Sequence, residues 1–403
     1  MLKKKCKTVN LIYASTNLDN KQNTEKNMTK KVYFENLDGL RFLCFLSVFF
    51  FHSFHTDFDY IKTTDIYHFI KKDIFGNGNL GVNFFFVLSG FLITYLLIEE
   101  KRLNGQIDIK KFWIRRILRI WPLFYLCVII GFFIFPFLKT AFGQQPNETA
   151  TIGYYLTFTN NFDFIKNGLP DASILGVLWS VAIEEQFYIV WPIILYLLPI
   201  KKYWLAFSTI IIGSLIFRGL NNNNMAHEHH TLSCIGDMTI GAFGSWLILT
   251  NEDFKTKIQN LKPIYITLIY ISFFTVYIFR DEILMNKILF LDIVERPIIA
   301  TIIMLIILEQ CFSDKSFFKM SKFKLLSKGG TITYGLYCLH FVGILIVTTL
   351  TKKYSINTEL WQVFIIDTSL ALILTIVISL ISYNIFEKPF LKLKDKFAYI
   401  KTK

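Results

Sequence analysis

Long apolar runs, separated by short polar segments, make up most of this chain. Runs long enough to cross the ~30 Å hydrocarbon layer of a bilayer lie at about 41–56, 80–98, 117–138, 178–199, 203–218, 232–249, 263–279, 288–308, 332–350 and 361–386. The chain is 53% hydrophobic and has 42 Phe, far more than a soluble domain of its 403 residues needs. We predict an all-α, polytopic membrane helical bundle of about ten transmembrane helices.

The polar segments divide the chain into one membrane domain, residues 36–390, between two cytoplasmic tails. Residues 1–35 are rich in Lys, Asn and Thr and are predicted to be disordered, and residues 391–403 form a basic tail. The first 31 residues are too polar for a cleaved signal peptide. The longest outer connection, 139–177, contains the aromatic stretch 154–164 and is predicted to be a re-entrant or interfacial lid.

The distribution of charge predicts the orientation. The net charge is +13, and about 31 of the 43 Lys and Arg residues fall on one side of the predicted spans. Such a bias follows the positive-inside rule and places both termini in the cytoplasm. A nucleic-acid-binding protein would instead gather its basic residues on one soluble face, so we expect no nucleic-acid partner.

Cysteine and histidine spacing gives no metal or disulfide pattern. The six cysteines are scattered, without a close pair. The cluster His227, Glu228, His229 and His230 has metal-capable side chains, but adjacent positions match no usual site. We therefore predict a solvated loop there, and no metal.

Arg41 and His52 lie in the first apolar run. Eleven residues make about three helical turns, which leaves the two side chains about 20° apart around the helix and about 16 Å apart along it. Ionisable residues in a membrane helix point to a functional site. The alternative is that Arg41 reaches the cytoplasmic headgroups and His52 caps the outer end of the helix.

The segment 112–122 carries a basic motif between the second and third spans. Arg116 and Arg119 share a helix face, and guanidinium groups bind phosphate through paired donors. This arrangement, together with Arg115, suits a phosphorylated ligand in the cytoplasm. Anchoring beside anionic lipid explains the motif equally well.

Glu184 and Glu185 lie in the fourth span, about two turns below the outer surface. Adjacent helical residues point about 100° apart, so the two carboxylates face different partners. One could orient His52 while the other satisfies an arginine or a tyrosine.

These landmarks resemble the membrane acyltransferase-3 family of bacterial O-acyltransferases. Arg41 with His52 resembles its Arg-x10-His signature, and Arg116 with Arg119 its basic cytoplasmic motif. The segments 81–91, 179–188, 334–340 and 386–389 are similar to further family motifs. Asn83 stands where the family often has aspartate, which leaves the role of that position open.

The resemblance implies transfer of an acyl group, usually acetyl, from a cytoplasmic thioester to a sugar hydroxyl across the membrane. Arg41, His52, Arg116 and Arg119 would be needed for activity. The location would be the bacterial inner (cytoplasmic) membrane, in contact with its lipids. We expect a stand-alone form without a fused esterase-like domain, or one that works with separate glycan-synthesis proteins.

The resulting hypothesis is that Arg116 and Arg119, with Arg115, hold the phosphates of acetyl-CoA. His52, oriented by Glu184 or Glu185, would act as general base on the acceptor hydroxyl of a glycan or lipid-linked sugar, or take the acyl group transiently. Most of the ~30 Å core separates the two sites, so the donor arm reaches deeply or another residue relays the acyl group. The candidate relays are Ser89, Ser180 and His340.

Two other classes of function stay open. A transporter or flippase of a lipid-linked sugar would use the charged residues within the spans as a permeation path; these are Arg41, Asp237, Glu295, Arg296 and Asp367. A structural subunit of a polysaccharide-export assembly assigns no role to His52. The acidic residues of spans four, six, eight and ten, on the same outer side as His52, further predict an outward-facing polar cavity roofed by 139–177.

Overall fold

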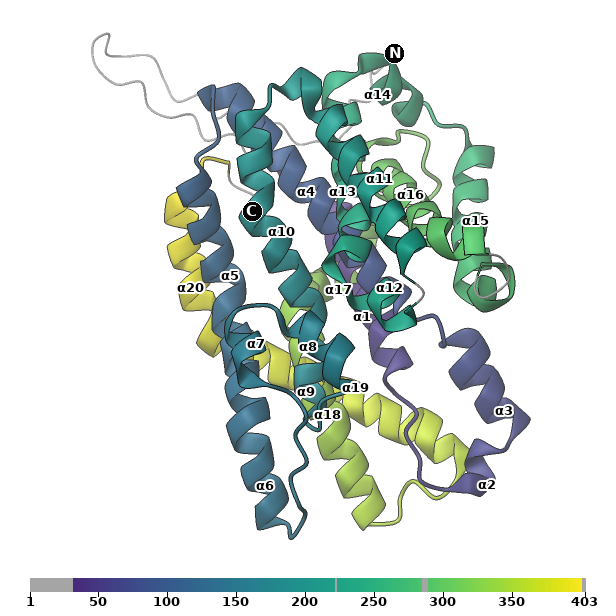
Figure 1. Ribbon diagram of the computed structural model, residues 1–403. Coiled ribbons are helices and arrows are strands. Elements are labelled where there is room, and N and C mark those ends of the chain that lie inside the picture. The colour runs from purple at the N-terminus through teal and green to yellow at the C-terminus, as the bar shows by residue number, and fades with distance from the viewer. Residues whose placement is uncertain (1–31, 222, 285–288, 401–403) are drawn as a thin grey trace.

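The protein is a bundle of long helices (Figure 1). The structure, a computed structural model, describes residues 32–221, 223–284 and 289–400, and this part of the chain contains no strand. The long helices are α1 (Glu35–Phe51), α4 (Leu80–Asn104), α5 (Ile109–Ile129), α10 (Leu178–Leu197), α11 (Tyr203–Leu220), α13 (Thr231–Thr250), α15 (Pro263–Ile283), α16 (Leu289–Phe312), α18 (Thr333–Lys353) and α19 (Thr368–Ile381).

Shorter helices cap or extend these. They are α2 (Asp59–Lys62), α3 (Asp65–His68), α6 (Phe135–Ala141), α7 (Ile152–Leu156), α8 (Asn160–Asn167), α9 (Ser173–Gly176), α12 (Asn224–His229), α14 (Glu252–Gln259), α17 (Lys324–Gly330) and α20 (Lys388–Lys394). The π-helical turns are η1 (Phe69–Ile74), η2 (Ile130–Ile134), η5 (Gln362–Asp367) and η6 (Ser382–Glu387). The 3₁₀ turns are η3 (Ile200–Lys202), η4 (Met320–Lys322) and η7 (Asp395–Phe397).

Each predicted span coincides with a long helix, which confirms the polytopic helical fold. Within the described residues, eight helical segments are long and apolar enough to cross a membrane. Two of them contain π-turns. In Ile109–Ala141, η2 joins α5 to α6, and in Gln362–Phe397, η5 precedes α19 and η6 joins it to α20 and η7. Because α1 has only 17 residues and α16 carries three charges in its first two turns, the count of ten spans stays a prediction.

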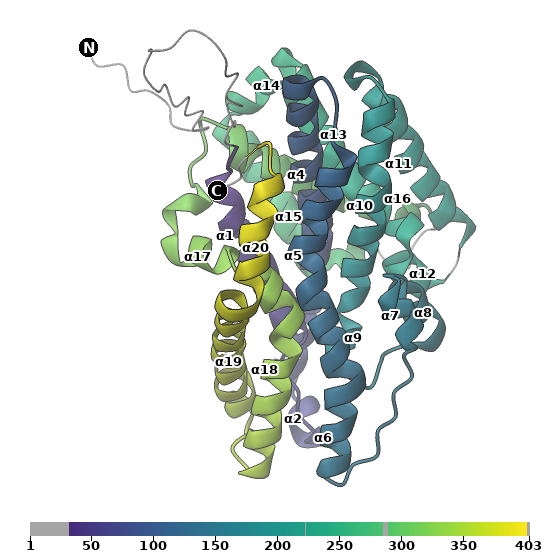
Figure 2. The ribbon, with the colours of Figure 1, turned by 90° about the vertical axis from the view of Figure 1, so that its left-hand side faces the viewer.

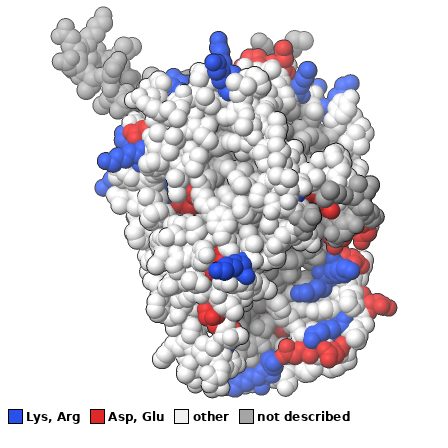
Figure 3. All heavy atoms as spheres, viewed as in Figure 1, with Lys and Arg blue, Asp and Glu red and all other residues white. Residues whose placement is uncertain are grey.

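Charged side chains are unevenly spread on the surface. On the face shown in Figure 3 they gather along the upper edge and at the lower right, where Figure 1 places α2 and α3. A broad area of mostly uncharged residues lies between these groups. This pattern is expected of a protein surrounded by hydrocarbon at mid-height.

The ends of the membrane domain extend beyond the predicted boundaries. Phe34 is buried, with its ring 5.1 Å from that of Tyr95 and 5.7 Å from that of Phe312, so the domain begins before residue 36. Residues 1–31 of the predicted tail lie outside the described residues. At the other end, the first part of the predicted basic tail is helical and packs along α5 (Figure 2).

The connection 139–177 folds back beside the long helices, as a re-entrant segment would, and contains α7, α8 and α9 (Figure 1). Its anchors are an ion pair between Lys139 and Asp171 at 2.7 Å and hydrogen bonds from Gln186 of α10 to Phe158 and Asn161. The aromatic Phe158 enters the main hydrophobic core. The predicted lid is therefore packed into the helix bundle through Phe158.

Helices α4 and α13 cross at the centre of the bundle through glycines. A Cβ atom at Gly90 would lie 1.8 Å from the backbone oxygen of Met238, and one at Gly241 would lie 2.0 Å from that of Val87. The contact is therefore backbone against backbone, a geometry that small residues allow in membrane helices.

We predict that Gly90→Ala lowers the stability of the protein by about 1–3 kcal/mol, because the added methyl group overpacks this crossing. Gly213→Ala in α11 is the matched control, since a Cβ atom there meets nothing within 4 Å. The measurement is the thermal midpoint and monodisperse yield in detergent. Equal behaviour of the two variants would contradict the tight crossing.

Candidate active site

The basic motif lies on the first half of α5. The Asp108 side chain caps this helix by accepting a hydrogen bond from the backbone N–H of Lys111 at 3.0 Å, which fits the preference for aspartate at helix starts. The Arg116 guanidinium lies 5.5 Å from the Phe112 ring centre and 5.4 Å from that of Tyr188 on α10. Its Nε atom is buried without a hydrogen-bond partner.

Arg116 and Arg119 form no ion pair within the described residues, whereas Arg115 does. Arg115 contacts the carboxylate of Glu100 at 3.0 Å and donates to the backbone oxygen of Phe397 at 2.8 Å. The donors of Arg115 are thus already used in holding α4 and the C-terminal segment together. Arg116 and Arg119 are the members of the motif left for an anion.

Glu184 and Glu185 point to different partners, as adjacent positions on a helix require. Ser89 of α4 donates to Glu184 Oε1 at 2.6 Å, and the Trp121 indole N–H of α5 donates to Glu185 Oε2 at 2.7 Å. Neither glutamate contacts His52 in these hydrogen bonds. The prediction that a glutamate orients His52 was therefore wrong: the two glutamates instead connect α10 to α4 and α5.

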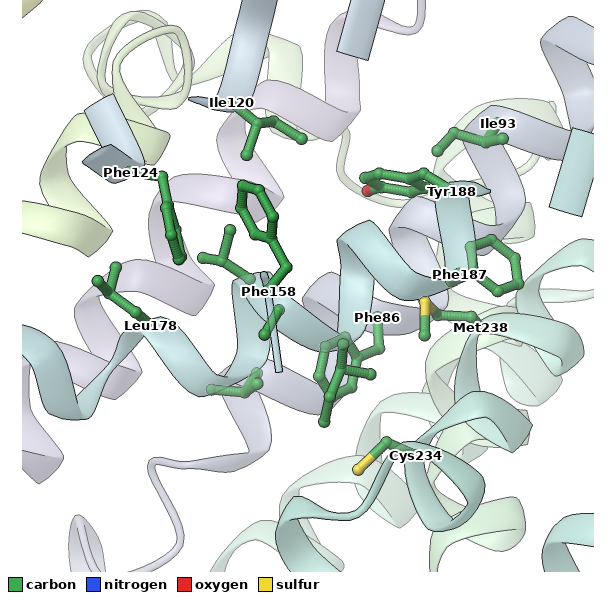
Figure 4. Close-up of a cluster of buried hydrophobic side chains, with 14 of the residues drawn as sticks. Phe86, Ile93, Ile120, Phe124, Phe158, Leu178, Phe187, Tyr188, Cys234 and Met238 are labelled. Carbon is green, nitrogen blue, oxygen red and sulfur yellow. The ribbon is translucent and has the colours of Figure 1, made fainter. Parts of the chain in front are cut away.

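Trp121 also connects Glu185 to the re-entrant segment. The Phe158 ring lies 5.2 Å from that of Trp121 and 4.3 Å from that of Phe124, and Figure 4 shows it beside Ile120 and Phe124 in the core. The partner of Glu185 could not be read from the sequence, although Trp121 lies inside the basic motif.

The partner of His52 is a second histidine, His340 of α18. His52 Nδ1 lies 3.0 Å from His340 Nε2, and the two rings are stacked with centres 5.1 Å apart. His340 was a candidate relay in the sequence but was not predicted to contact His52. The two residues are 288 positions apart, so only the packing of α18 against α1 brings them together.

The contacts of His340 determine where the protons lie on both rings. His340 Nδ1 is 2.6 Å from the backbone oxygen of Tyr337, and because a carbonyl only accepts, Nδ1 is the donor. In a neutral ring Nε2 then accepts, so His52 Nδ1 donates to it. The Nε2 atom of His52 is left unprotonated and available as a base.

Arg41 and His52 lie at different levels and do not form a pair. The Arg41 guanidinium contacts Asp38 at 2.7 Å and lies within electrostatic range of Arg119. His52 ends α1, its backbone N–H bonded to the Val48 oxygen. The end-capping position foreseen in the alternative interpretation is thus observed, in addition to the contact of its ring with His340.

A line of polar groups joins the basic motif to the histidine pair. The Tyr188 ring faces the Arg116 guanidinium, and Glu184 lies one turn nearer the N-terminus of α10. Ser180, another turn nearer the N-terminus, has its hydroxyl 2.8 Å from that of Tyr337. The backbone oxygen of Tyr337 accepts the hydrogen bond from His340. Ser89, Ser180 and His340, the three candidate relays, all lie on this line.

A second set of buried charges is balanced within itself. Asp237 pairs with Arg296 at 2.6 Å, and Glu295 pairs with Arg280 and, at 3.5 Å, with Arg218. Asp237 and Glu295 are almost fully buried, so they do not line the predicted outward-facing cavity. The neutral Asn83 donates to Asp237 at 3.0 Å, which gives this position a structural partner.

The His227–His230 segment is folded rather than solvated. Glu228 contacts Arg280 at 2.9 Å and Arg296 at 3.4 Å, which joins it to the balanced charges. His227 is buried, and His230 begins α13 by accepting from the backbone N–H of Leu232. The prediction of a solvated loop was wrong, because these side chains satisfy buried groups. No group of metal ligands is found within the described residues.

Comparison with known proteins adds to this geometry. The family profile described as "Acyltransferase domain" matches residues 34–384. The chain belongs to the acyltransferase-3 family. The match includes α1, the basic motif of α5, the two glutamates of α10 and the histidine of α18.

Two relatives are named for their activity. The chain is 34% identical over 194 residues to the peptidoglycan O-acetyltransferase OatA of Listeria monocytogenes, which is 47% of this chain and 28% of that protein. It is 33% identical over 195 residues to the O-acetyltransferase OatA of Staphylococcus aureus, 47% of this chain and 29% of that one. The matched region thus spans less than a third of these relatives. No solved structure matches the chain.

Asp237→Asn should destabilise the protein by about 3 kcal/mol or more, because it removes the shorter of the two ion pairs of Arg296 and leaves three buried arginines with two carboxylates. Glu252→Gln is the control: it breaks the exposed Glu252–Lys255 pair, which should contribute less than about 1 kcal/mol. Thermal unfolding of both variants in detergent is the measurement. A shift for Asp237→Asn no larger than that of the control would show that the buried pair is dispensable.

Proposed function

We propose that this protein transfers an acyl group, acetyl in the first instance, from cytoplasmic acetyl-CoA to a hydroxyl of a cell-surface or other extracytoplasmic glycan. The observation that carries the proposal is the polar line from Arg116 to His52. At one end it has two arginines that form no ion pair among the described residues, and at the other an imidazole whose Nε2 can accept a proton. Such a line through a membrane domain joins a donor on one side to an acceptor on the other.

The donor end is assigned to Arg116 and Arg119. Phosphate groups suit arginine because its planar fork donates two hydrogen bonds at once. Arg115 contributes indirectly, by fixing the neighbouring C-terminal segment. The thioester arm would extend from this site along Tyr188, Glu184 and Ser180 toward the histidines.

The acceptor end is assigned to His52. Its Nε2 takes the proton of the acceptor hydroxyl, and the oxygen attacks the thioester carbonyl. The carbon–sulfur bond breaks, and the departing thiolate receives the proton back from His52. An imidazole suits both steps because one ring nitrogen can accept a proton and return it. His340 positions the ring through its hydrogen bond at 3.0 Å. Direct attack and relay through Ser89, Ser180 or His340 both fit this path.

The setting proposed for the reaction is the bacterial inner membrane, with both termini in the cytoplasm, as the positive-inside bias predicts. The relatives' names, peptidoglycan O-acetyltransferase and O-acetyltransferase, support a glycan of the cell envelope or its lipid-linked precursor as acceptor. Glycan-synthesis proteins of the same membrane would be its partners.

Transport of a lipid-linked sugar is the second candidate, and the structure favours it less. A permeation path needs charges that can meet a moving substrate. Asp237 and Arg296 are held in a buried ion pair, Glu295 is bonded to Arg280, and Arg41 to Asp38. These charges are engaged with one another and not with an open path.

Loss of the chain should lower the acetyl content of envelope glycans, and wild-type protein should restore it while His52→Ala should not. General-base catalysis typically contributes about 10²–10⁴-fold to rate, so residual activity should be at or below about 1%. The measurement is ester-linked acetate released from purified glycans by mild alkali. His55→Ala is the control, because His55 is exposed and three residues further out. Full activity of a well-inserted His52→Ala protein would exclude the general base.

Arg116→Ala should weaken use of the donor by about tenfold or more, the value of a charge-assisted hydrogen bond, and Arg116→Lys should restore little, because an ammonium lacks the paired donors. Donor titration in membrane vesicles measures this. Lys110→Ala, an exposed residue of the same helix, should leave the donor KM unchanged. If Arg116→Ala changes only membrane anchoring, the motif binds lipid headgroups.

A further inference from the structure

The C-terminal segment is attached to the start of α5 by several contacts. Phe397 accepts from Arg115 at 2.8 Å, and the Tyr399 hydroxyl lies 2.5 Å from Lys111 Nζ and donates to Asp108 at 3.2 Å. Ile400 is buried. In both views α20 runs alongside α5 (Figures 1 and 2). The segment is therefore a fixed part of the wall beside the basic motif.

Two lysines of this segment, Lys392 and Lys394, lie on different faces of α20 and differ in burial. Glu387 and Lys394 are seven residues apart, about two turns, and so share a face. Glu387 is buried, and the Lys394 side chain is only 19% exposed. Lys392, on another face of α20, is exposed. Phe397, one turn beyond Lys394, is the residue bonded to Arg115 next to Arg116.

Lys394 adds a third cation beside Arg116 and Arg119. It lies within electrostatic range of both Arg116 and Arg119. Its ion pair is with the adjacent Asp395 at 3.3 Å, a side chain that is 67% exposed, and such exposed pairs contribute little. Arg116 and Arg119 have no ion pair within the described residues. Glu184 and Glu387 lie within electrostatic range of these arginines but form no ion pair with them among the described residues. The Nε atom of Arg116 is buried without a hydrogen-bond partner, so a bound anion would find a donor there that no carboxylate occupies.

We propose that Lys394 is a third cationic ligand for the phosphate groups of the donor, and that residues 388–400 form one wall of the donor site. The inference rests on the proposed function, since it names a further binding residue for the same site. It also gives a role to the tail that the sequence marked only as basic. Lys394 contacts the anion as a point charge, while the arginines supply the directed hydrogen bonds.

The test is binding of radiolabelled CoA to the purified full chain in detergent, with donor KM and kcat measured in vesicles. Lys394→Ala should weaken CoA binding and raise the donor KM by about five- to tenfold, with kcat nearly unchanged. Lys394→Arg should bind within about twofold of wild type, because it keeps the charge. The matched control is Lys392→Ala, on the same helix, which should bind like wild type.

The outcomes separate the two proposals. Equal CoA binding by Lys394→Ala and Lys392→Ala would overturn the role of Lys394 and leave the proposed function intact. Absence of CoA binding by the wild-type chain would overturn the donor assignment itself. If Lys394→Ala loses retention of anionic lipid while CoA binding is unchanged, the lysine binds headgroups and the inference fails. A loss shared by Lys394→Arg, with a lowered thermal midpoint, would assign a structural role instead.

Discussion

Compensation of buried charge is the constraint on which this membrane domain depends. A single unpaired ion in hydrocarbon costs at least about 2.5 kcal/mol. The buried charges between α11, α12, α13, α15 and α16 meet this constraint with three arginines and three carboxylates. The neutrality extends to Asn83, since an aspartate there would add a fourth negative charge beside Asp237. These ion pairs hold the helices together because the groups are buried, so water cannot solvate a charge whose partner moves away.

The basic motif of α5 departs from the same constraint, and this makes it the functional candidate. Arg115 is paired with Glu100. Arg116 and Arg119 form no ion pair within the described chain, although Glu184 and Glu387 lie within electrostatic range of them. A charged group without a directly bonded partner is expected in a membrane domain only where water or a ligand can reach it. Arg115 and Arg116 are adjacent, yet only Arg115 has an ion pair. This contrast distinguishes a structural arginine from a candidate binding residue more clearly than the motif alone.

The sequence predicted the helices well and their contacts poorly, for a physical reason. Spans depend on hydropathy over about 20 successive residues, so the fold class and the positions of all ten long helices followed from local pattern. Contacts between helices depend on rotation and depth, which no local pattern encodes. His52 was therefore matched with Glu184 or Glu185 instead of His340, and the His227–His230 segment was taken for a solvated loop. The residue types of the site could be predicted, but their partners could not.

The segment 139–177 is linked to the buried carboxylate of Glu185 through Phe158 and Trp121. Phe158 adopts a positive φ of 54°, a conformation that costs about 1 kcal/mol or more for a residue other than glycine. The strain persists because its ring is packed against Trp121 and Phe124 and its backbone oxygen accepts from Gln186. Trp121 in turn donates to Glu185. Displacement of the segment 139–177 would therefore remove the packing that fixes this indole, so the environment of Glu185 depends on this connection.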